Sequence, residues 1–287
     1  MRIVGILLAA TLTLAACSRG EGGGLTDHWS RMADPASWRP QAGTCHYGFE
    51  PRLMRSAYDP VDCADDHRFE TVHVGQFGGE VPASEPPAES TPQFRSAWAD
   101  CDARATAYLG GQWRDRQVRV AVSMPAPQGW KAGSRWYMCL LGPVEWTGNR
   151  STVLDQSLKG RYASLPVLEW GCGDQPDSGE FKPTDCREPH DTEFVGSFSL
   201  DMSYAAVKAR YDANDPLFHR ECLKLIAGFV GVSGAAKLPR GTGSSYWLPD
   251  GADWEAGDRS VRCFLWIDGG AVSGSLRNAG TGGLTRG

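Results

Sequence analysis

The chain has 287 residues, a formal net charge of −5 and a hydrophobic fraction of 41%. This length suffices for two domains of ordinary size, and the composition is normal for a folded chain. The acidic balance and the lack of a basic stripe argue against nucleic acid as a partner.

The N-terminal segment indicates export. Arg2 precedes an apolar run, Ile3 to Ala16, which is too short to span a bilayer and ends in small residues, as in a secretory signal peptide. Leu14-Ala15-Ala16-Cys17 resembles the lipobox of bacterial lipoproteins. The resemblance implies a signal peptide over 1–16, diacylation of Cys17 and a lipid anchor at the outer face of the cell membrane. The alternative is an ordinary cleaved signal with an unpaired Cys17.

A flexible, glycine-containing tether is expected over 17–40. Eight cysteines follow it, in two sets of four with similar surroundings. The sets are Cys45, Cys63, Cys101, Cys139 and Cys172, Cys186, Cys222, Cys263. We therefore expect one module written twice, over 41–163 and 164–277, with a disordered tail over 278–287.

In the first module, Phe69 to Val74 alternates like a strand. Thr91-Pro92 then suits the start of a helix, whose apolar face runs from Phe94 to Tyr108 and which ends at Gly110-Gly111. Strands are expected at Val118 to Val122 and at Arg135 to Leu141.

The second module follows the same order. A strand is expected over Glu193 to Phe198, an extra helix over Ser203 to Tyr211, and a main helix from Asp215-Pro216 to Gly231. Strands at Ser244 to Leu248 and Arg259 to Ile267 complete it. The expected fold class is α+β, with two tandem homologous disulfide-stapled modules, each a small antiparallel sheet with one packed helix.

An exported chain meets an oxidising environment, in which eight thiols form a disulfide framework. Zinc binding is the rival interpretation, but the chain has no Cys-x-x-Cys pair. Matched pairing within each copy leaves three alternatives. We favour Cys45–Cys63, Cys101–Cys139, Cys172–Cys186 and Cys222–Cys263, so that one bond per copy holds the N-terminal segment and one joins helix to sheet.

Two repeated motifs could carry chemistry. His67 with Glu70, and His190 with Glu193, form His-x-x-Glu, a pattern that could bind a metal or act as an acid–base pair. On a strand this spacing does not put both side chains on one face, and a structural role explains the repetition more directly.

The second motif is Trp-x-x-Gly-x-Arg, which ends in Arg135 and in Arg259. Each arginine could bind a carboxylate bidentately, or pair with Asp62 or Asp185 inside its own module. A Gly-x-Ser-x-Gly nucleophile motif and a phosphate-binding glycine loop are absent from the sequence.

The repeated layout resembles the septum-formation domain family of exported actinobacterial proteins. The matching residues are Val61-Asp62-Cys63 with His67 and Glu70, Thr184 to His190 with Glu193, the helix cysteines, and the two Trp-x-x-Gly-x-Arg runs. The first copy departs from the second by having Asp66 where the second has Pro189.

The resemblance implies an extracytoplasmic protein linked with the envelope or with cell division, and it transfers no catalytic residue. We therefore expect a non-enzymatic, membrane-anchored binding or scaffold module without cofactor or metal. Its partners would be the membrane, through the lipid anchor, and an envelope protein or cell-wall ligand. The alternative is an envelope hydrolase that uses the repeated His-x-x-Glu motif.

Overall fold

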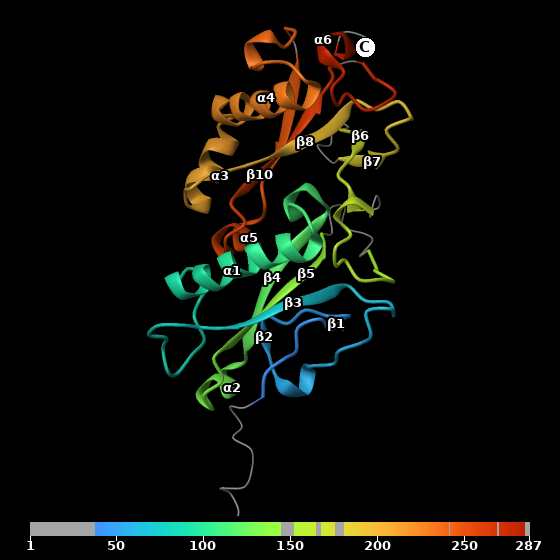
Figure 1. Cartoon of the computed structure of the whole chain (residues 1–287). Coiled ribbons are helices and arrows are strands. Elements are labelled where there is room, and N and C mark those ends of the chain that lie inside the picture. Colours follow the sequence, from blue (N-terminus) through green and yellow to red (C-terminus); the bar gives the residue numbers. More distant parts are fainter. Residues whose placement is uncertain are drawn as a thin grey trace, which may run out of the picture.

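A computed structural model describes residues 38–144, 152–164, 168–175, 181–240, 242–268 and 270–284. The expected signal peptide, the expected lipidation site Cys17 and most of the expected tether lie outside the described residues. The described chain forms two stacked units, each with its own sheet (Figure 1). We call residues 38–164 the N-terminal unit and residues 168–284 the C-terminal unit.

The N-terminal sheet has five strands in the order β1-β3-β5-β4-β2. Their bounds are β1 Cys45–His46, β2 Arg52–Leu53, β3 Phe69–Gln76, β4 Val118–Pro125 and β5 Trp136–Pro143. Strand β2 runs parallel to β4, whereas the other pairings are antiparallel. The expected antiparallel sheet is therefore present in β1, β3, β5 and β4, and β2 departs from it, because the segment before β3 adds a short edge strand in the direction of β4.

The C-terminal sheet has the order β7-β6-β8-β10-β9, with antiparallel pairings. Its strands are β6 Cys172–Asp174, β7 Lys182–Thr184, β8 Thr192–Ser199, β9 Gly243–Trp247 and β10 Ser260–Trp266. Strands β3, β5 and β4 of the first sheet correspond in order and direction to β8, β10 and β9 of the second. The short strands β1, β2, β6 and β7 have too few residues to show a periodic pattern in the sequence.

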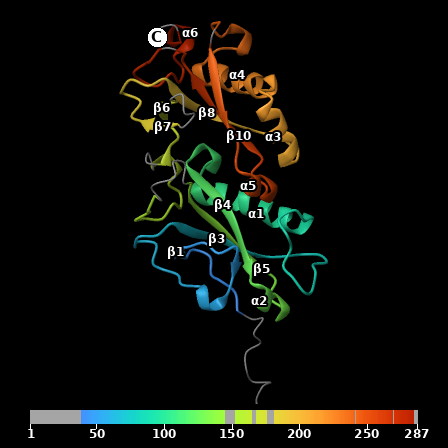
Figure 2. The same cartoon turned by 180° about the vertical axis from the view of Figure 1, so that it is seen from behind.

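One long helix packs on each sheet. Helix α1, Pro92–Leu109, begins with Thr91 as N-cap and ends at Gly110, whose φ of 83° suits a left-handed C-cap. Helix α4, Pro216–Val230, begins at the N-cap Asp215 and ends at Gly231 with φ 80°. Both helices lie in front of the strands in Figure 1 and behind them in Figure 2.

The remaining helices are short. They are α2 Pro127–Lys131, α3 Tyr204–Asp212, α5 Gly251–Ala256 and α6 Gly280–Gly283, with 3₁₀ turns at Arg55–Ala57, Trp113–Asp115, Tyr162–Ser164 and Ala235–Lys237. Helix α3 is the expected extra helix. Helix α6 lies inside the segment 278–287, which the sequence suggested would be disordered, and Leu284 beside it packs on the core of the C-terminal unit. In the part of the chain that the structure describes, no helix is both long and apolar enough to cross a bilayer.

Four disulfides join Cys45–Cys63, Cys101–Cys139, Cys172–Cys186 and Cys222–Cys263. These are the same pairs as those favoured from the sequence. Cys101 and Cys222 lie on α1 and α4 and are fully buried, so each helix is covalently joined to the strand that carries the last cysteine of its unit, β5 or β10. The structure thus has the α+β class expected from the alternation of strand and helix patterns.

The central strand β5 is buried along its whole length. One of its faces packs with α1, where Trp98, Cys101 and Leu109 belong to the main core. Its other face packs a second cluster, in which Trp136 contacts Trp38 edge-on. A strand covered on both faces explains why Trp136–Pro143 reads as an almost continuous apolar run.

Candidate functional site

The first His-x-x-Glu motif holds the segment that follows the N-terminal sheet. The Glu70 carboxylate accepts hydrogen bonds from the Leu158 amide (2.6 Å), the Ser157 hydroxyl (2.9 Å) and the Tyr108 hydroxyl (2.8 Å). His67 forms a two-way backbone bridge with Leu154. Burial raises the pKa of Tyr108 to about 12, and Glu70 contributes to the rise, so the phenol stays a donor to the carboxylate.

Glu70 and His67 also contact each other. His67 Nδ1 lies 2.7 Å from the Asp65 carbonyl oxygen, and Nε2 lies 3.1 Å from Glu70 Oε1. A carbonyl oxygen only accepts, so Nδ1 carries a proton. If Nε2 also donates to the carboxylate, the imidazolium and Glu70 form a fully buried ion pair.

The second His-x-x-Glu motif, His190 with Glu193, likewise holds the segment that follows the sheet of the C-terminal unit. The Glu193 carboxylate accepts from the Ser275 hydroxyl and, at 2.8 Å, from the Leu276 amide. His190 forms the backbone bridge with Val272, and its Nδ1 donates to the Glu188 carbonyl oxygen. His190 Nε2 has no hydrogen-bond partner among the described residues. The hydrogen bond between histidine and glutamate is therefore found in the N-terminal unit, whereas in both units the glutamate carboxylate binds the segment that follows the sheet.

Each motif also lies beside a cysteine. Cys45 with His67 and Glu70, and Cys172 with His190 and Glu193, place potential metal-binding atoms within 4.8 Å of one another. Both cysteines are in disulfides, and a disulfide sulfur is not the thiolate that binds zinc. Both carboxylates also accept hydrogen bonds from their own chain. With the disulfides formed, neither group has three free ligand atoms, although His190 Nε2 has no hydrogen-bond partner among the described residues. This favours the structural role over the metal or acid–base role.

The Trp-x-x-Gly-x-Arg motifs form a buried corner before the last strand of each sheet. Trp130 and Trp254 are fully buried, and their indoles donate to the carbonyl oxygens of Pro82 (2.7 Å) and Met202 (2.8 Å). Gly133 has φ 99°, in the region that favours glycine. The tryptophans are therefore core residues here.

The arginines of these motifs do not make the expected contacts with Asp62 and Asp185. Arg135 Nη1 donates to the Trp130 carbonyl oxygen at 2.7 Å, and its guanidinium lies over the Trp130 ring. Arg259 pairs with Asp201 at 2.6 Å. The alternative pairing with Asp62 and Asp185 is not seen among the described residues, because both aspartates form turns in the cysteine loops, where the amides of Ala64 and Arg187 donate to them.

The contact between the two units contains the polar side chains that the sequence did not single out. Arg114, in the 3₁₀ turn after α1, pairs with Asp102 at 2.7 Å and with Asp258 of the other unit at 3.3 Å. Asp258 also accepts from Arg262 at 3.2 Å. Trp170 donates from its indole to the Arg114 carbonyl oxygen. The units therefore share a hydrogen-bonded, buried interface.

Arg262 is the most deeply buried cation of this interface, with 1% of its surface exposed. It lies near the rings of Trp247 (4.7 Å), Trp170 (5.6 Å) and Trp113 (6.0 Å). Burial lowers its pKa, and Asp258 opposes that effect. A signal for Arg262 was present in the sequence, since the residue before the last cysteine is Met138 in the N-terminal unit and Arg262 in the C-terminal unit.

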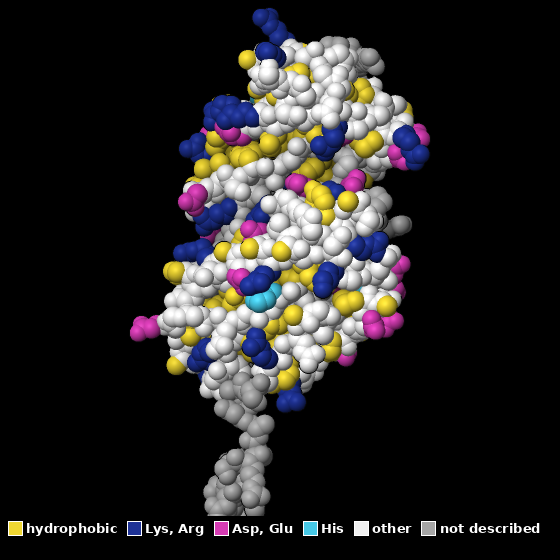
Figure 3. Space-filling view, viewed as in Figure 1, with side chains coloured by type: hydrophobic (Ala, Val, Ile, Leu, Met, Phe, Trp, Pro, Cys, Tyr) yellow, Lys and Arg dark blue, Asp and Glu magenta, His cyan; other side chains and the backbone are white. Residues whose placement is uncertain are grey.

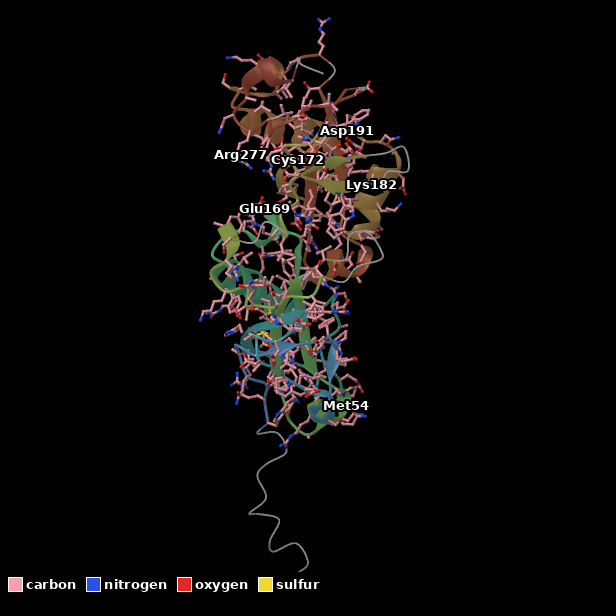
Figure 4. The ribbon with its side chains drawn as sticks, turned by 90° about the vertical axis from the view of Figure 1, so that its right-hand side faces the viewer. Met54, Glu169, Cys172, Lys182, Asp191 and Arg277 are labelled. Carbon is pink, nitrogen blue, oxygen red and sulfur yellow. A yellow bond between two sulfur atoms is a disulfide. The ribbon has the colours of Figure 1, made fainter. Side chains whose placement is uncertain are left out.

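The side view in Figure 4 shows where these parts lie along the molecule. Glu169 lies at the junction of the units, and Met54 lies at the far end of the N-terminal unit. Cys172, Lys182, Asp191 and Arg277 lie in the C-terminal unit. On the face shown in Figure 3, acidic and basic side chains are interspersed rather than gathered by sign, which agrees with the absence of a basic stripe from the sequence.

A protein-family model described as septum formation matches residues 42–263. The chain belongs to the septum-formation family. The match to this family runs across both units, from before β1 to the last cysteine, Cys263.

Two curated proteins from two strains of Mycobacterium tuberculosis, each described as an uncharacterised membrane protein, are similar to this family member. Each is 25% identical over 226 residues, which cover 71% of this chain and 47% of the relative. The chain thus spans about half the length of these relatives. No solved structure matches the chain.

Proposed function

We propose that this protein is an exported lipoprotein, anchored through Cys17 at the outer face of the cell membrane, which acts in septum formation as a non-enzymatic binding or scaffold protein. The observation that carries the proposal is the family match over residues 42–263. The M. tuberculosis relatives described as membrane proteins support an association with the envelope.

The arrangement of the two units supports a duplicated scaffold. In both, a buried glutamate holds the segment after the sheet, a buried tryptophan fills the corner before the last strand, and one disulfide joins the long helix to that last strand. We infer that the units are tandem homologous copies of one module. A motif that serves the same structural contact in both copies is accounted for without catalysis.

Localisation in cells tests the role in septum formation. A fluorescent fusion that matures in an oxidising compartment should gather at septa, and a deletion strain should show misplaced or delayed septa. The Cys17→Ala variant should lose membrane association because it cannot be acylated. A uniform peripheral signal together with normal septa in the deletion strain would contradict the division role, whereas unchanged membrane association of Cys17→Ala would contradict the anchor.

The partner and the absence of catalysis need separate measurements. Proximity labelling from the same fusion should enrich an envelope protein or a cell-wall ligand. Metal analysis of the purified protein should find no stoichiometric zinc. An envelope hydrolase activity lost in Glu193→Gln while the fold is intact would instead favour the enzyme.

A further inference from the structure

A cavity of about 410 Å³ opens between the two units, which is within the usual range for small-molecule sites. Its walls come from the N-terminal unit on one side and from α5, β9 and β10 on the other. The residues that carry the argument are Phe49, Arg68, Arg119, Trp247, Asp253 and Arg262. Since both units contribute, this cavity exists only because they pack together.

The cavity is lined by cations that the protein does not fully pair. Arg262 Nε and Nη1 and Arg68 Nε are buried and have no hydrogen-bond partner among the described residues. Arg119 lies over the rings of Phe49 (5.8 Å) and Phe69 (5.6 Å). A buried donor without a partner costs free energy, and a charge-assisted bond to a carboxylate would recover it.

Of the three aspartates that line the cavity, one has a carboxylate without a hydrogen-bond partner among the described residues. Asp258 is bonded to Arg114 and Arg262, and Asp250 caps α5 by accepting from the Asp253 amide. The Asp253 carboxylate makes no hydrogen bond among the described residues. Burial raises its pKa to about 6, with a further contribution from Asp250, so it carries a negative charge at neutral pH but loses it readily in acid.

A plain anion would meet the cations but also face Asp250, Asp253 and Asp258 across the same small space. A zwitterion matches both signs. We propose that the cavity binds a zwitterionic dipeptide, with its carboxylate held by Arg119 and by the Nε and Nη1 donors of Arg262, which are unpaired among the described residues. The ammonium group lies at Asp253, and the side chain packs against Trp247 and Phe49.

This inference rests on the proposed binding role and names its site and ligand class. It does not rest on the localisation, because binding is measured on purified protein and septal placement is measured in cells. If the purified protein binds the ligand but the protein in cells is spread evenly over the membrane, only the proposed division role is contradicted. If the protein gathers at septa but does not bind the ligand, only the proposed binding site is contradicted.

Calorimetric titration of the full protein in detergent tests the site with four probes: dialanine, N-acetyl-dialanine, dialanine amide and inorganic phosphate. Dialanine should bind, and blocking either its ammonium or its carboxylate should weaken binding by about tenfold or more, which corresponds to about 1.4 kcal/mol. Phosphate should bind more weakly than dialanine. Equal binding of dialanine and both blocked forms, tighter binding of phosphate, or no binding of dialanine would overturn the proposal.

Variants locate the binding in this cavity. Arg119→Gln should weaken the binding of dialanine and N-acetyl-dialanine alike, and Asp253→Asn should weaken the binding of dialanine while leaving that of N-acetyl-dialanine unchanged. Arg277→Gln is the matched control, since Arg277 lies over Phe229 at 4.5 Å and lines a different cavity. Arg262 is too deeply buried for a first test. An Arg277→Gln effect equal to that of Arg119→Gln would place the binding elsewhere and overturn the assignment.

Discussion

Arg114 and Asp258 lie 144 residues apart in the chain, and their side chains are joined by an ion pair of 3.3 Å across the contact between the two units. Asp258 is mostly buried and also accepts from Arg262. One carboxylate therefore balances a cation from each unit. This arrangement fixes how the units sit relative to each other and so forms the walls of the cavity between them.

Removing the carboxylate should destabilise the interface. Asp258→Asn leaves Arg114 and Arg262 without their shared anion, and breaking a buried pair costs about 3–5 kcal/mol. Chemical unfolding should show that loss or a separate, earlier transition for one unit. The control is Arg104→Gln, because the Arg104–Asp100 pair lies on the exposed face of α1 and should contribute below about 0.5 kcal/mol. Equal effects of the two changes would contradict the interface role.

A glycine at the same contact allows a matched pair of substitutions. Gly257 has φ +136°, and a Cβ there would lie 2.5 Å from the Trp98 ring of the other unit. Gly234 has φ +112° with open space around it. Gly234→Ala should cost about 1 kcal/mol through the backbone alone, and Gly257→Ala about 1–3 kcal/mol more through overpacking. Thermal unfolding of both variants checks this, and similar values would show that the units do not press together there.

The buried glutamates should control the segments that follow the sheets. Glu70→Ala removes the acceptor for the Leu158 amide and for the Ser157 and Tyr108 hydroxyls, at a cost of about 3 kcal/mol or more. Hydrogen exchange at the Leu158 amide should rise, and Glu193→Ala should have the same effect at Leu276. Asp66→Ala, at an exposed position near Glu70, should leave exchange unchanged. If the Leu158 amide stays protected from hydrogen exchange in Glu70→Ala, Glu70 does not hold the segment after the sheet.

The disulfides should differ in their effect on stability. Replacing both Cys101 and Cys139 by alanine opens a loop with a sequence separation of 38, against 18 for Cys45 and Cys63. The chain-entropy estimate gives losses of about 4 and about 3 kcal/mol. Peptide mapping without reductant should recover the four pairs, and a peptide that links Cys45 to Cys101 would contradict them.

The buried acid Asp253 should make stability depend on pH. Its pKa is raised from 3.8 to about 6, so the folded state holds the proton more tightly than the unfolded chain. The stabilising contribution is present below pH about 4 and is lost as pH rises through about 6. Asp253→Asn should therefore be more stable than the natural protein at pH 7 by about 1–3 kcal/mol, with the gain vanishing near pH 4. A gain that is independent of pH would contradict the assignment.

The long elements could be predicted because their signals are local. The Thr91 cap, the apolar spacing along α1 and the stop at Gly110 lie within one stretch of chain. The same holds for Asp215, α4 and Gly231. The short helices α2 and α5 were not predicted, since five or six residues carry too little periodicity.

The candidate site was predicted less well than the fold. His67, Glu70, His190 and Glu193 were identified as repeated, and their structural role was favoured, but the segments that the glutamates hold were not foreseen. Arg262 was missed because it forms one member of a β-strand whose other residues are mostly apolar. Comparing Arg262 with Met138, which precedes the last cysteine of the N-terminal unit, could have found it.

The long strands and helices, the eight paired cysteines and the repeated motifs could be predicted from the sequence, because each depends on neighbours within a few residues or on a count. What the motifs contact and how the units meet became known from the folded chain. The pairing of Arg114 with Asp258 and the cavity beside Arg262 depend on residues that lie far apart in the chain. Their meeting is set by the packing of α1 against α5, which no local periodicity encodes.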